Sequence, residues 1–465
     1  MSRETPQRGG RAGLIGAVVA LVVALALAAT SVFAGSEIVH ALTGTPKAHW
    51  QAGTTPQAPP PVLEAMNAQA PIPTESGVSA SLAPLLSAQA LGPHVTASVV
   101  DVSTGQSIFS SEQDAAMIPA STTKVVTAAT ALATRGPAYR IQTRVVAGAQ
   151  PGEVVIVAGG DPTLGVFPTS YYPGAARIDD LAAQVKKALG DTAPTKVTYD
   201  VSVFSGSGIG PGWDPDATTG GSGAVITPLM TEGGRTKPLK YSDRYAQPDQ
   251  QAAQAFAKAL GAPATAVVAG TAPQGARELG KVESAPLARM VEFMLQESDN
   301  VLADALARQV ALAKNQPASF EGAATAMKGV LQDLGLPVAG YGLVDGSGFS
   351  RNDRLSPALL TGILTLAARA DQGDLHAIFS GLPVAAYSGT LATRYVKSQE
   401  GGSAAGLVRA KTGTLTGVNS LTGIVVDADG RTLAFAFMAD QTTNPNQAVI
   451  ALDRVAAALA ACGCR

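Results

Sequence analysis

The chain has 465 residues, 46% of them hydrophobic and only 15% charged, and its formal net charge is −2 at pH 7. This length allows roughly three domains of about 150 residues, and the lack of a Lys- or Arg-rich block beyond the N-terminus argues against a nucleic-acid partner. The only two cysteines, Cys462 and Cys464, exclude a disulfide scaffold or a four-cysteine zinc site, and we interpret them as part of a frayed tail. The four histidines lack ligand spacing, so no metal site is expected.

The N-terminal region divides into three parts. Residues 1–11 predict a basic cytoplasmic leader, residues 12–34 carry no charge, and residues 35–78 form a Pro-rich linker. As a helix, the 23-residue apolar run spans about 34 Å, enough for a bilayer core. It is a signal peptide cleaved after Ala34 or an uncleaved membrane anchor, and a buried core helix is the less favoured alternative. The basic start places the body outside the cytoplasm, in the cell envelope, either secreted or anchored to the cell membrane.

Residues 79–138 begin the first globular domain. Val95–Asp101 is strand-like, and Gln106–Ser110 returns as its partner after a turn. A helix of about fifteen residues is expected from Ser121 onwards. Lys124 then lies on the same face as Ser121, because residues three positions apart are neighbours on a helix.

Two further segments complete the organisation. In residues 139–280 short β-rich runs alternate with helical runs and Gly-rich connections, which predicts one or two inserted α/β domains. Residues 281–465 return to helical periodicity and end in a hairpin, with its turn at Asp429-Gly430, and an apolar helix. Together with residues 79–138 they predict an α+β domain, an antiparallel sheet with helices packed on it.

Three short motifs carry possible chemistry. In Ser121-Thr122-Thr123-Lys124 the amine can reach the hydroxyl, and a lysine whose pKa is lowered can take a serine proton. Ser298-Asp299-Asn300, between two predicted helices, offers a second hydroxyl and an amide; Ser350-Arg351-Asn352 fits the same loose pattern but lies in a loop. Lys411-Thr412-Gly413-Thr414 lies on a predicted strand edge, where an extended peptide can pair. Each motif alone also fits an ordinary cap, turn or strand end.

The three motifs, in this order and on these elements, resemble those of penicillin-binding proteins and serine β-lactamases. The 174 residues from Lys124 to Ser298 leave room for a large insertion. With that insertion, the chain is similar over about residues 80–460 to the D-Ala-D-Ala carboxypeptidases/endopeptidases of the penicillin-binding protein 4 type, peptidase family S13. Three other stretches resemble this family as well: Gly160–Leu164, Gly210–Trp213 and Asp345–Gly348. The resemblance implies a penicillin-binding-protein/β-lactamase-like domain formed by residues 79–138 and 281–465.

The resemblance and the residue chemistry imply the same catalytic roles. Ser121 attacks the bond between two D-alanines of a peptidoglycan stem peptide and forms an acyl-enzyme, while Lys124 takes the hydroxyl proton. Ser298, with Lys411 nearby, returns a proton to the leaving D-alanine. Asn300 positions Lys124 and the substrate amide. No metal or organic cofactor is needed, and β-lactams are expected to acylate Ser121 as covalent inhibitors.

The third motif is expected to bind the substrate. Lys411, Thr412 and Thr414 bind the terminal carboxylate, and Gly413 leaves room for the ligand backbone. The family implies an oxyanion hole formed by the backbone N–H groups of Ser121 and Thr414. Because Lys411 faces a carboxylate, it is expected to stay charged and to lower the pKa of the other lysine by repulsion.

Two other functions remain alternatives. A serine β-lactamase uses the same motifs but hydrolyses its acyl-enzyme quickly, and the large insertion argues against it. A non-catalytic wall-binding or sensor protein would tolerate loss of the motifs, yet all three are intact. The balance between carboxypeptidase and endopeptidase activity stays open.

Overall fold

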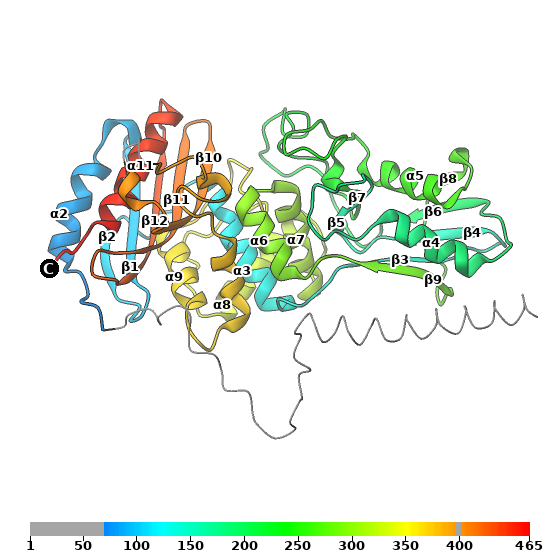
Figure 1. Ribbon diagram of the computed structural model, residues 1–465, viewed down its shortest axis with the longest axis horizontal. Coiled ribbons are helices and arrows are strands. Elements are labelled where there is room, and N and C mark those ends of the chain that lie inside the picture. The colour runs from blue at the N-terminus through cyan, green and yellow to red at the C-terminus, as the bar shows by residue number, and fades with distance from the viewer. Residues whose placement is uncertain (1–68, 397–400) are drawn as a thin grey trace, which may run out of the picture. The chain divides into compact units, whose positions relative to one another are not determined.

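The computed structural model describes residues 69–396 and 401–465 (Figure 1). The predicted leader, the apolar run at 12–34 and most of the linker lie outside the described residues. Within the described part, none of the helices combines the length and apolarity that crossing a bilayer requires. Helix α2 (Glu75–Leu86) begins inside the stretch assigned to the linker, because the Thr74 hydroxyl caps it by accepting a hydrogen bond from the Gly77 amide at 3.1 Å.

The first sheet is antiparallel throughout and is built from both ends of the described chain. Its strand order is β10-β11-β12-β1-β2, so the last strand in sequence pairs with the first. The strands are β1 (His94–Asp101), β2 (Ser107–Ser111), β10 (Val408–Leu415), β11 (Val418–Val426) and β12 (Thr432–Asp440). The chain therefore leaves this sheet after β2 and returns to it only at β10.

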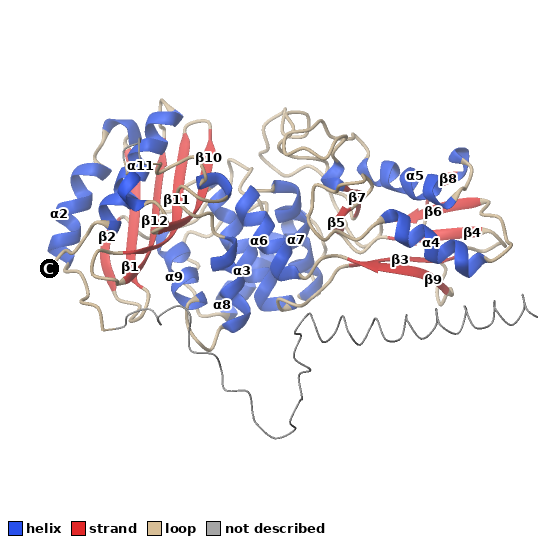
Figure 2. Ribbon diagram, viewed as in Figure 1, coloured by secondary structure: helices blue, strands red, loops and turns tan. Residues whose placement is uncertain are grey.

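Helices cover both faces of this sheet (Figure 2). Alternate residues of a strand point to opposite faces, and in β12 Phe435 and Phe437 join one hydrophobic cluster while Ala434, Ala436 and Met438 join another. The first cluster includes α2 and α11 (Pro445–Ala460). The second includes α3 (Thr123–Arg135), α6 (Leu287–Glu297), α7 (Asn300–Ala313), α8 (Phe320–Asp333) and α9 (Pro357–Ala367). The predicted antiparallel sheet with flanking helices is confirmed.

A second, mixed sheet occupies the predicted insertion, with strand order β8-β6-β4-β3-β9 (green in Figure 1). Its strands are β3 (Gln142–Ala147), β4 (Glu153–Val157), β6 (Lys196–Asp200), β8 (Val267–Ala269) and β9 (Glu278–Glu283). The parallel pairs β4–β6 and β6–β8 need crossovers, which α4 (Ile178–Leu189) and α5 (Pro248–Leu260) provide. Since β9 ends three residues beyond the expected boundary, residues 139–283 are called the insertion below.

A two-stranded sheet and a side-chain hydrogen bond lie where the insertion meets the helical layer. Strand β5 (Asp161–Leu164) pairs with β7 (Leu229–Thr231), and the Gln309 side chain of α7 donates to the Gly159 carbonyl at 2.8 Å. In Figure 1, α3, α6 and α7 lie between the first sheet and the strands of the insertion. The insertion therefore adjoins the helices that carry the first two motifs.

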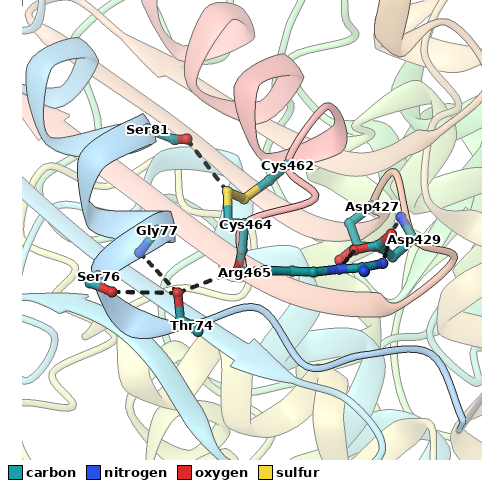
Figure 3. Close-up of a disulfide and its surroundings, with 9 residues drawn as sticks. All are labelled: Thr74, Ser76, Gly77, Ser81, Asp427, Asp429, Cys462, Cys464 and Arg465. Carbon is teal, nitrogen blue, oxygen red and sulfur yellow. Dashed lines mark hydrogen bonds and ion pairs between the residues drawn. A yellow bond between two sulfur atoms is a disulfide. The ribbon is translucent and has the colours of Figure 1, made fainter.

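The C-terminal tail is ordered, so its interpretation as frayed is wrong (Figure 3). Cys462 and Cys464 form a disulfide, and Cys462 is buried. The Thr74 amide donates to the Cys464 carbonyl at 2.7 Å, and Arg465 forms an ion pair with Asp429 at 2.7 Å. These contacts fasten the end of the chain to the start of α2 and to the turn between β11 and β12.

Candidate active site

Ser121 lies just before the regular α-helix rather than at its first residue. It occupies the 3₁₀ turn η2 (Ala120–Thr122), which leads into α3 at Thr123. The turn is anchored at Pro119, whose carbonyl accepts hydrogen bonds from the Thr122 and Ser420 hydroxyls, each at 2.7 Å. Ser121 itself is only partly buried, so its hydroxyl is held in place but remains accessible.

Lys124 is completely buried beneath Ser121 and joins the first two motifs. Its Nζ donates to Ser121 Oγ at 2.9 Å, to Asn300 Oδ1 at 2.6 Å and to the Ser347 carbonyl at 2.6 Å. A neutral amine has two N–H groups and one lone pair. The two oxygens of Asn300 and Ser347 are obligate acceptors, so the lone pair of neutral Lys124 is directed at the Ser121 hydroxyl.

Burial lowers the pKa of Lys124 to about 8, and the nearby carboxylates of Asp304 and Asp345 partly offset this effect. With that value about one tenth of the amine is neutral at pH 7. The predicted depression of the pKa is present. Its main cause is desolvation rather than repulsion from Lys411.

The second motif is the junction between α6 and α7. Ser298 ends α6 in a left-handed conformation, with φ 57° and ψ 40°, and Asp299 caps α7 by accepting a hydrogen bond from the Leu302 amide at 2.9 Å. This sharp junction lets Ser298 and Asn300 serve different lysines. Ser298 Oγ accepts from Lys411 Nζ at 2.9 Å, whereas Asn300 Oδ1 accepts from Lys124.

The third motif lies on β10, the edge strand of the first sheet. Besides Ser298, Lys411 Nζ bonds the Thr412 carbonyl at 2.9 Å, and Thr412 Oγ1 lies 2.9 Å from Thr390 Oγ1. A Cβ at Gly413 would come within 2.1 Å of Ser420 Oγ and 2.7 Å of the Pro119 carbonyl. Glycine at this position is thus explained by close packing against the turn that holds Ser121.

Burial also acts on the second lysine, Lys411, which is completely buried. Burial lowers the pKa of Lys411 well below its usual value, and the charge of Lys124 lowers it further. Burial therefore disfavours the charged form of Lys411, and the charge expected at this position stays a prediction. A bound carboxylate would reverse the shift, because an opposite charge favours the ammonium form.

A cavity of about 330 Å³ opens above the two lysines. The domain that carries the three motifs, called the catalytic domain below, contributes the hydroxyl and amide groups of Ser121, Ser298, Asn300, Thr390, Thr412 and Thr414 and the carboxylates of Glu297 and Asp299. The insertion contributes the cations Arg235, Lys240 and Arg244 together with Tyr171, Ser222 and Tyr241. Five of the eight predicted site residues therefore line one cavity. Lys124 and Lys411 lie beneath it and donate to Ser121 and Ser298, while Gly413 packs behind it against Pro119 and Ser420. The alternative Ser350 motif is not used in this way, since the Ser350 hydroxyl donates to the Pro211 carbonyl at 2.6 Å.

Several groups of the site were missed from the sequence. The Ser347 carbonyl lies in the Asp345–Gly348 stretch, which resembles the family, but a backbone acceptor carries no sequence signal. Asp304 had a usable signal, because it lies four residues after Asn300 on the same helix face. Arg235 had none, since 64 residues separate it from its partner Asp299.

This fold and this serine–lysine arrangement define a serine peptidase of the penicillin-binding, β-lactamase-like class. Residues 78–244 and 233–459 match the D-Ala-D-Ala carboxypeptidase 3 (S13) family. The chain belongs to this family, as the motifs predicted.

Individual relatives agree with the family match. The chain is 40% identical to carboxypeptidase Rv3627c of Mycobacterium tuberculosis, with 89% of this chain and 92% of the relative covered. It is also 40% identical to carboxypeptidase DacB of Mycolicibacterium smegmatis, with 96% of each covered. The solved structure of penicillin binding protein 4 from Haemophilus influenzae aligns with a TM-score of 0.67 and 21% identity, covering 82% of this chain and 98% of that one, which shows the shared fold.

Proposed function

We propose that the protein is a serine-type D-Ala-D-Ala carboxypeptidase, with DD-endopeptidase activity, that acts on peptidoglycan stem peptides through an acyl-enzyme on Ser121. The observation that carries this proposal is the hydrogen-bonded pair of Ser121 and buried Lys124 at the base of an open cavity. The printed names of the relatives, carboxypeptidases, agree with it. The related Haemophilus influenzae protein has been solved in complex with a β-lactam, which supports β-lactams as ligands here.

Acylation follows from the contacts of the first motif. Neutral Lys124 accepts the Ser121 proton as Oγ bonds to the carbonyl carbon between the two D-alanines. The carbonyl oxygen becomes an oxyanion, which the backbone N–H groups of Ser121 and Thr414 stabilise; both residues line the cavity. Asn300 keeps the amine aimed at the hydroxyl through its 2.6 Å contact with Lys124.

The second hydroxyl completes the acyl transfer. Ser298 gives its proton to the leaving amine of D-alanine as the C–N bond breaks, and Lys411, 2.9 Å away, replaces that proton. The terminal carboxylate binds beside Lys411, Thr412 and Thr414. Water then attacks the acyl carbon and gives one proton to the Ser298–Lys411 pair. The bond to Ser121 Oγ breaks as Lys124 returns its proton to that oxygen, and the shortened peptide leaves with a free carboxyl group.

The two lysines make this series of proton transfers depend on the binding of substrate. Burial lowers the pKa of Lys411 well below its usual value, which disfavours the charged form of this residue. A substrate carboxylate raises the pKa of Lys411 and charges it. The ammonium form of Lys411 repels a charge on Lys124 and therefore favours the neutral, basic form of Lys124.

The decisive experiment is labelling with a fluorescent penicillin followed by digestion of purified muropeptides. We expect long-lived labelling of the wild type, none of Ser121→Ala, and loss of terminal D-alanine or cross-links detected by mass. Ser110→Ala, an exposed serine of β2, is the matched control. Fast turnover of the adduct would identify a β-lactamase, and a folded wild type that is never labelled would identify a wall-binding protein.

We further propose that the body acts in the cell envelope, because the basic residues 1–11 and the apolar run 12–34 resemble a signal peptide or anchor. A reporter enzyme active only outside the cytoplasm, fused after Arg465, is expected to be active. The mass of the mature chain separates cleavage after Ala34 from retention of an anchor. A reporter that works only in the cytoplasm contradicts this location.

A further inference from the structure

A tight turn of the insertion reaches the active site. It is the sequence Glu232-Gly233-Gly234-Arg235, directly after β7, and its first three residues have φ of 54°, 62° and 77°. A Cβ at Gly233 would lie 2.4 Å from Tyr172 Oη, so only glycine fits there. The Glu232 carboxylate fastens the turn by accepting hydrogen bonds from the Tyr171 amide at 2.8 Å and the Ser170 hydroxyl at 2.9 Å. This turn presents Arg235 in one orientation.

Arg235 uses nearly all of its hydrogen-bonding capacity and is 3% exposed. Nη2 donates to Asp299 Oδ2 at 2.8 Å, and Nη1 donates to Tyr172 Oη at 2.8 Å. Nε donates to the Leu239 carbonyl at 3.1 Å, and the guanidinium lies 3.7 Å from the ring centre of Tyr171. A lysine could not reproduce this planar set of contacts.

The partner of Arg235 is the central residue of the second motif. Asp299 Oδ2 accepts from both Arg235 and Tyr172, while Asp299 Oδ1 caps α7. Burial opposes ionisation of Asp299, but the charges of Arg235 and Arg244 hold the pKa of its carboxyl below the usual value. A carboxylate whose two oxygens are both hydrogen-bonded thus stands between Ser298 and Asn300 in the chain.

Both neighbours of Asp299 depend on an exact local backbone. Ser298 keeps a left-handed conformation that residues with a Cβ rarely adopt, and such a conformation persists only where its surroundings fix it. Asn300 Nδ2 donates to the Ser222 carbonyl at 3.2 Å, a second contact from the insertion to the same motif. The catalytic domain supplies the two lysines that contact this motif. The insertion supplies two further contacts to it, from Arg235 and from the Ser222 carbonyl.

We propose that Arg235 is a positioning residue for acyl transfer, which acts through Asp299 to hold Ser298 and Asn300 against their two lysines. The inference rests on the proposed function of these residues. It gives the insertion a part in the chemical step itself. Arg235 touches no reacting atom, so its removal should lower the rate of acylation more than the affinity for the ligand.

The test measures the β-lactam acylation rate constant per titrated active site, together with the apparent affinity from its concentration dependence. Arg235→Met keeps the length of the side chain and removes its charge, and we expect a rate about 100-fold lower with little change in affinity. Arg235→Lys, which can still pair with Asp299, should lose only about 10-fold. Arg144→Met, an exposed arginine of β3 in the same insertion, is the control and should match the wild type.

A double-mutant cycle separates positioning from general stability. In the Ser298→Ala background the Arg235→Met change should cost less than about 10-fold, because the group it positions is already missing. The same loss of about 100-fold in both backgrounds, or a wild-type rate per titrated site in Arg235→Met, would overturn the proposal. If Arg235→Met does not fold, Tyr172→Phe removes one bond from both Arg235 and Asp299 and should still slow acylation about 3-fold; an unchanged rate in that variant also overturns it.

The outcome is distinguishable from a failure of the proposed function. Persistent labelling of folded Ser121→Ala would contradict the acyl-enzyme itself. Loss of labelling in Ser121→Ala together with an unaffected Arg235→Met would contradict only the role of Arg235.

Discussion

The cavity has two kinds of wall, and each uses its cations differently. The catalytic domain contributes Lys124 and Lys411, both fully buried, and burial lowers the pKa of each. The insertion contributes Arg235, for which burial opposes the charge but Tyr172 and Asp299 together raise the pKa of the guanidinium. Burial thus disfavours the charge of the two lysines, whereas Arg235 keeps its charge.

The difference follows from the work that each wall does. A base must be neutral for part of the time, which a desolvated lysine achieves and an arginine does not. A residue that only fixes geometry serves better with a permanent charge and several donors in a plane. The same physical condition, burial, therefore serves catalysis in one wall and positioning in the other.

The largest effect is expected where arginine replaces a lysine that must accept a proton. Lys124→Arg should lower β-lactam acylation about 1,000-fold, because a guanidinium cannot act as the base. Lys411→Arg keeps a cation beside the carboxylate and should retain much more activity, about 10-fold to 100-fold below wild type. Stopped-flow acylation rates test both variants. A milder effect in Lys124→Arg than in Lys411→Arg would show that Lys124 is not the base.

The next largest effect concerns the turn that presents Arg235. Gly233→Ala should lower the free energy of unfolding by about 2–3 kcal/mol, since it combines a left-handed backbone with a clash against Tyr172. Gly261→Ala is the matched control: its backbone is also left-handed, with φ of 85° and ψ of 18°, but no atom lies within 4 Å of the added Cβ, so about 1 kcal/mol is expected. Denaturant unfolding measures both. Equal losses in the two variants would mean that the turn is not tightly packed against Tyr172.

A smaller effect sharpens the relation between the two lysines. The acylation rate of the wild type should rise with pH and level off above about 8, because Lys124 acts in its neutral form and its pKa is about 8. In Lys411→Arg a permanent charge replaces an amine whose pKa burial lowers, and this charge lowers the pKa of Lys124 by repulsion. Its neutral form then appears at lower pH, so the rising limb should move to lower pH by up to about one unit. A shift to higher pH would contradict the repulsion between these positions.

The smallest effect is expected far from the cavity. Lys196 and Glu153 form an ion pair at 3.6 Å in the insertion, with 42% and 22% of their side chains exposed. Lys196→Met should change the free energy of unfolding by less than about 0.5 kcal/mol and leave acylation unchanged, since water screens such pairs. Thermal melts and acylation rates measure this. An effect comparable with that of Arg235→Met would remove the distinction between buried and exposed cations in the insertion.

Sequence patterns predict most of the fold wherever the hydrophobic periodicity is strong. The strand expected at Val95–Asp101 is β1, the helix expected after Ser121 is α3, and the hairpin around Asp429-Gly430 joins β11 to β12. Two regions were misjudged. The chain around Glu75 was assigned to the linker because prolines precede it, and the two C-terminal cysteines were assigned to a frayed tail because nothing in the sequence indicates what they pack against.

The sequence by itself determined the three motifs, their order and the elements that carry them, because helix and strand periodicity and side-chain chemistry are local properties. It also led to the family, which depends on the same local patterns. Only the tertiary structure decided that Lys411 is completely buried, which lowers the pKa of its amine, and that Arg235 pairs with Asp299. Burial and long-range contact depend on which distant segments meet in space, and 64 residues of chain between Arg235 and Asp299 leave no periodic trace of their meeting.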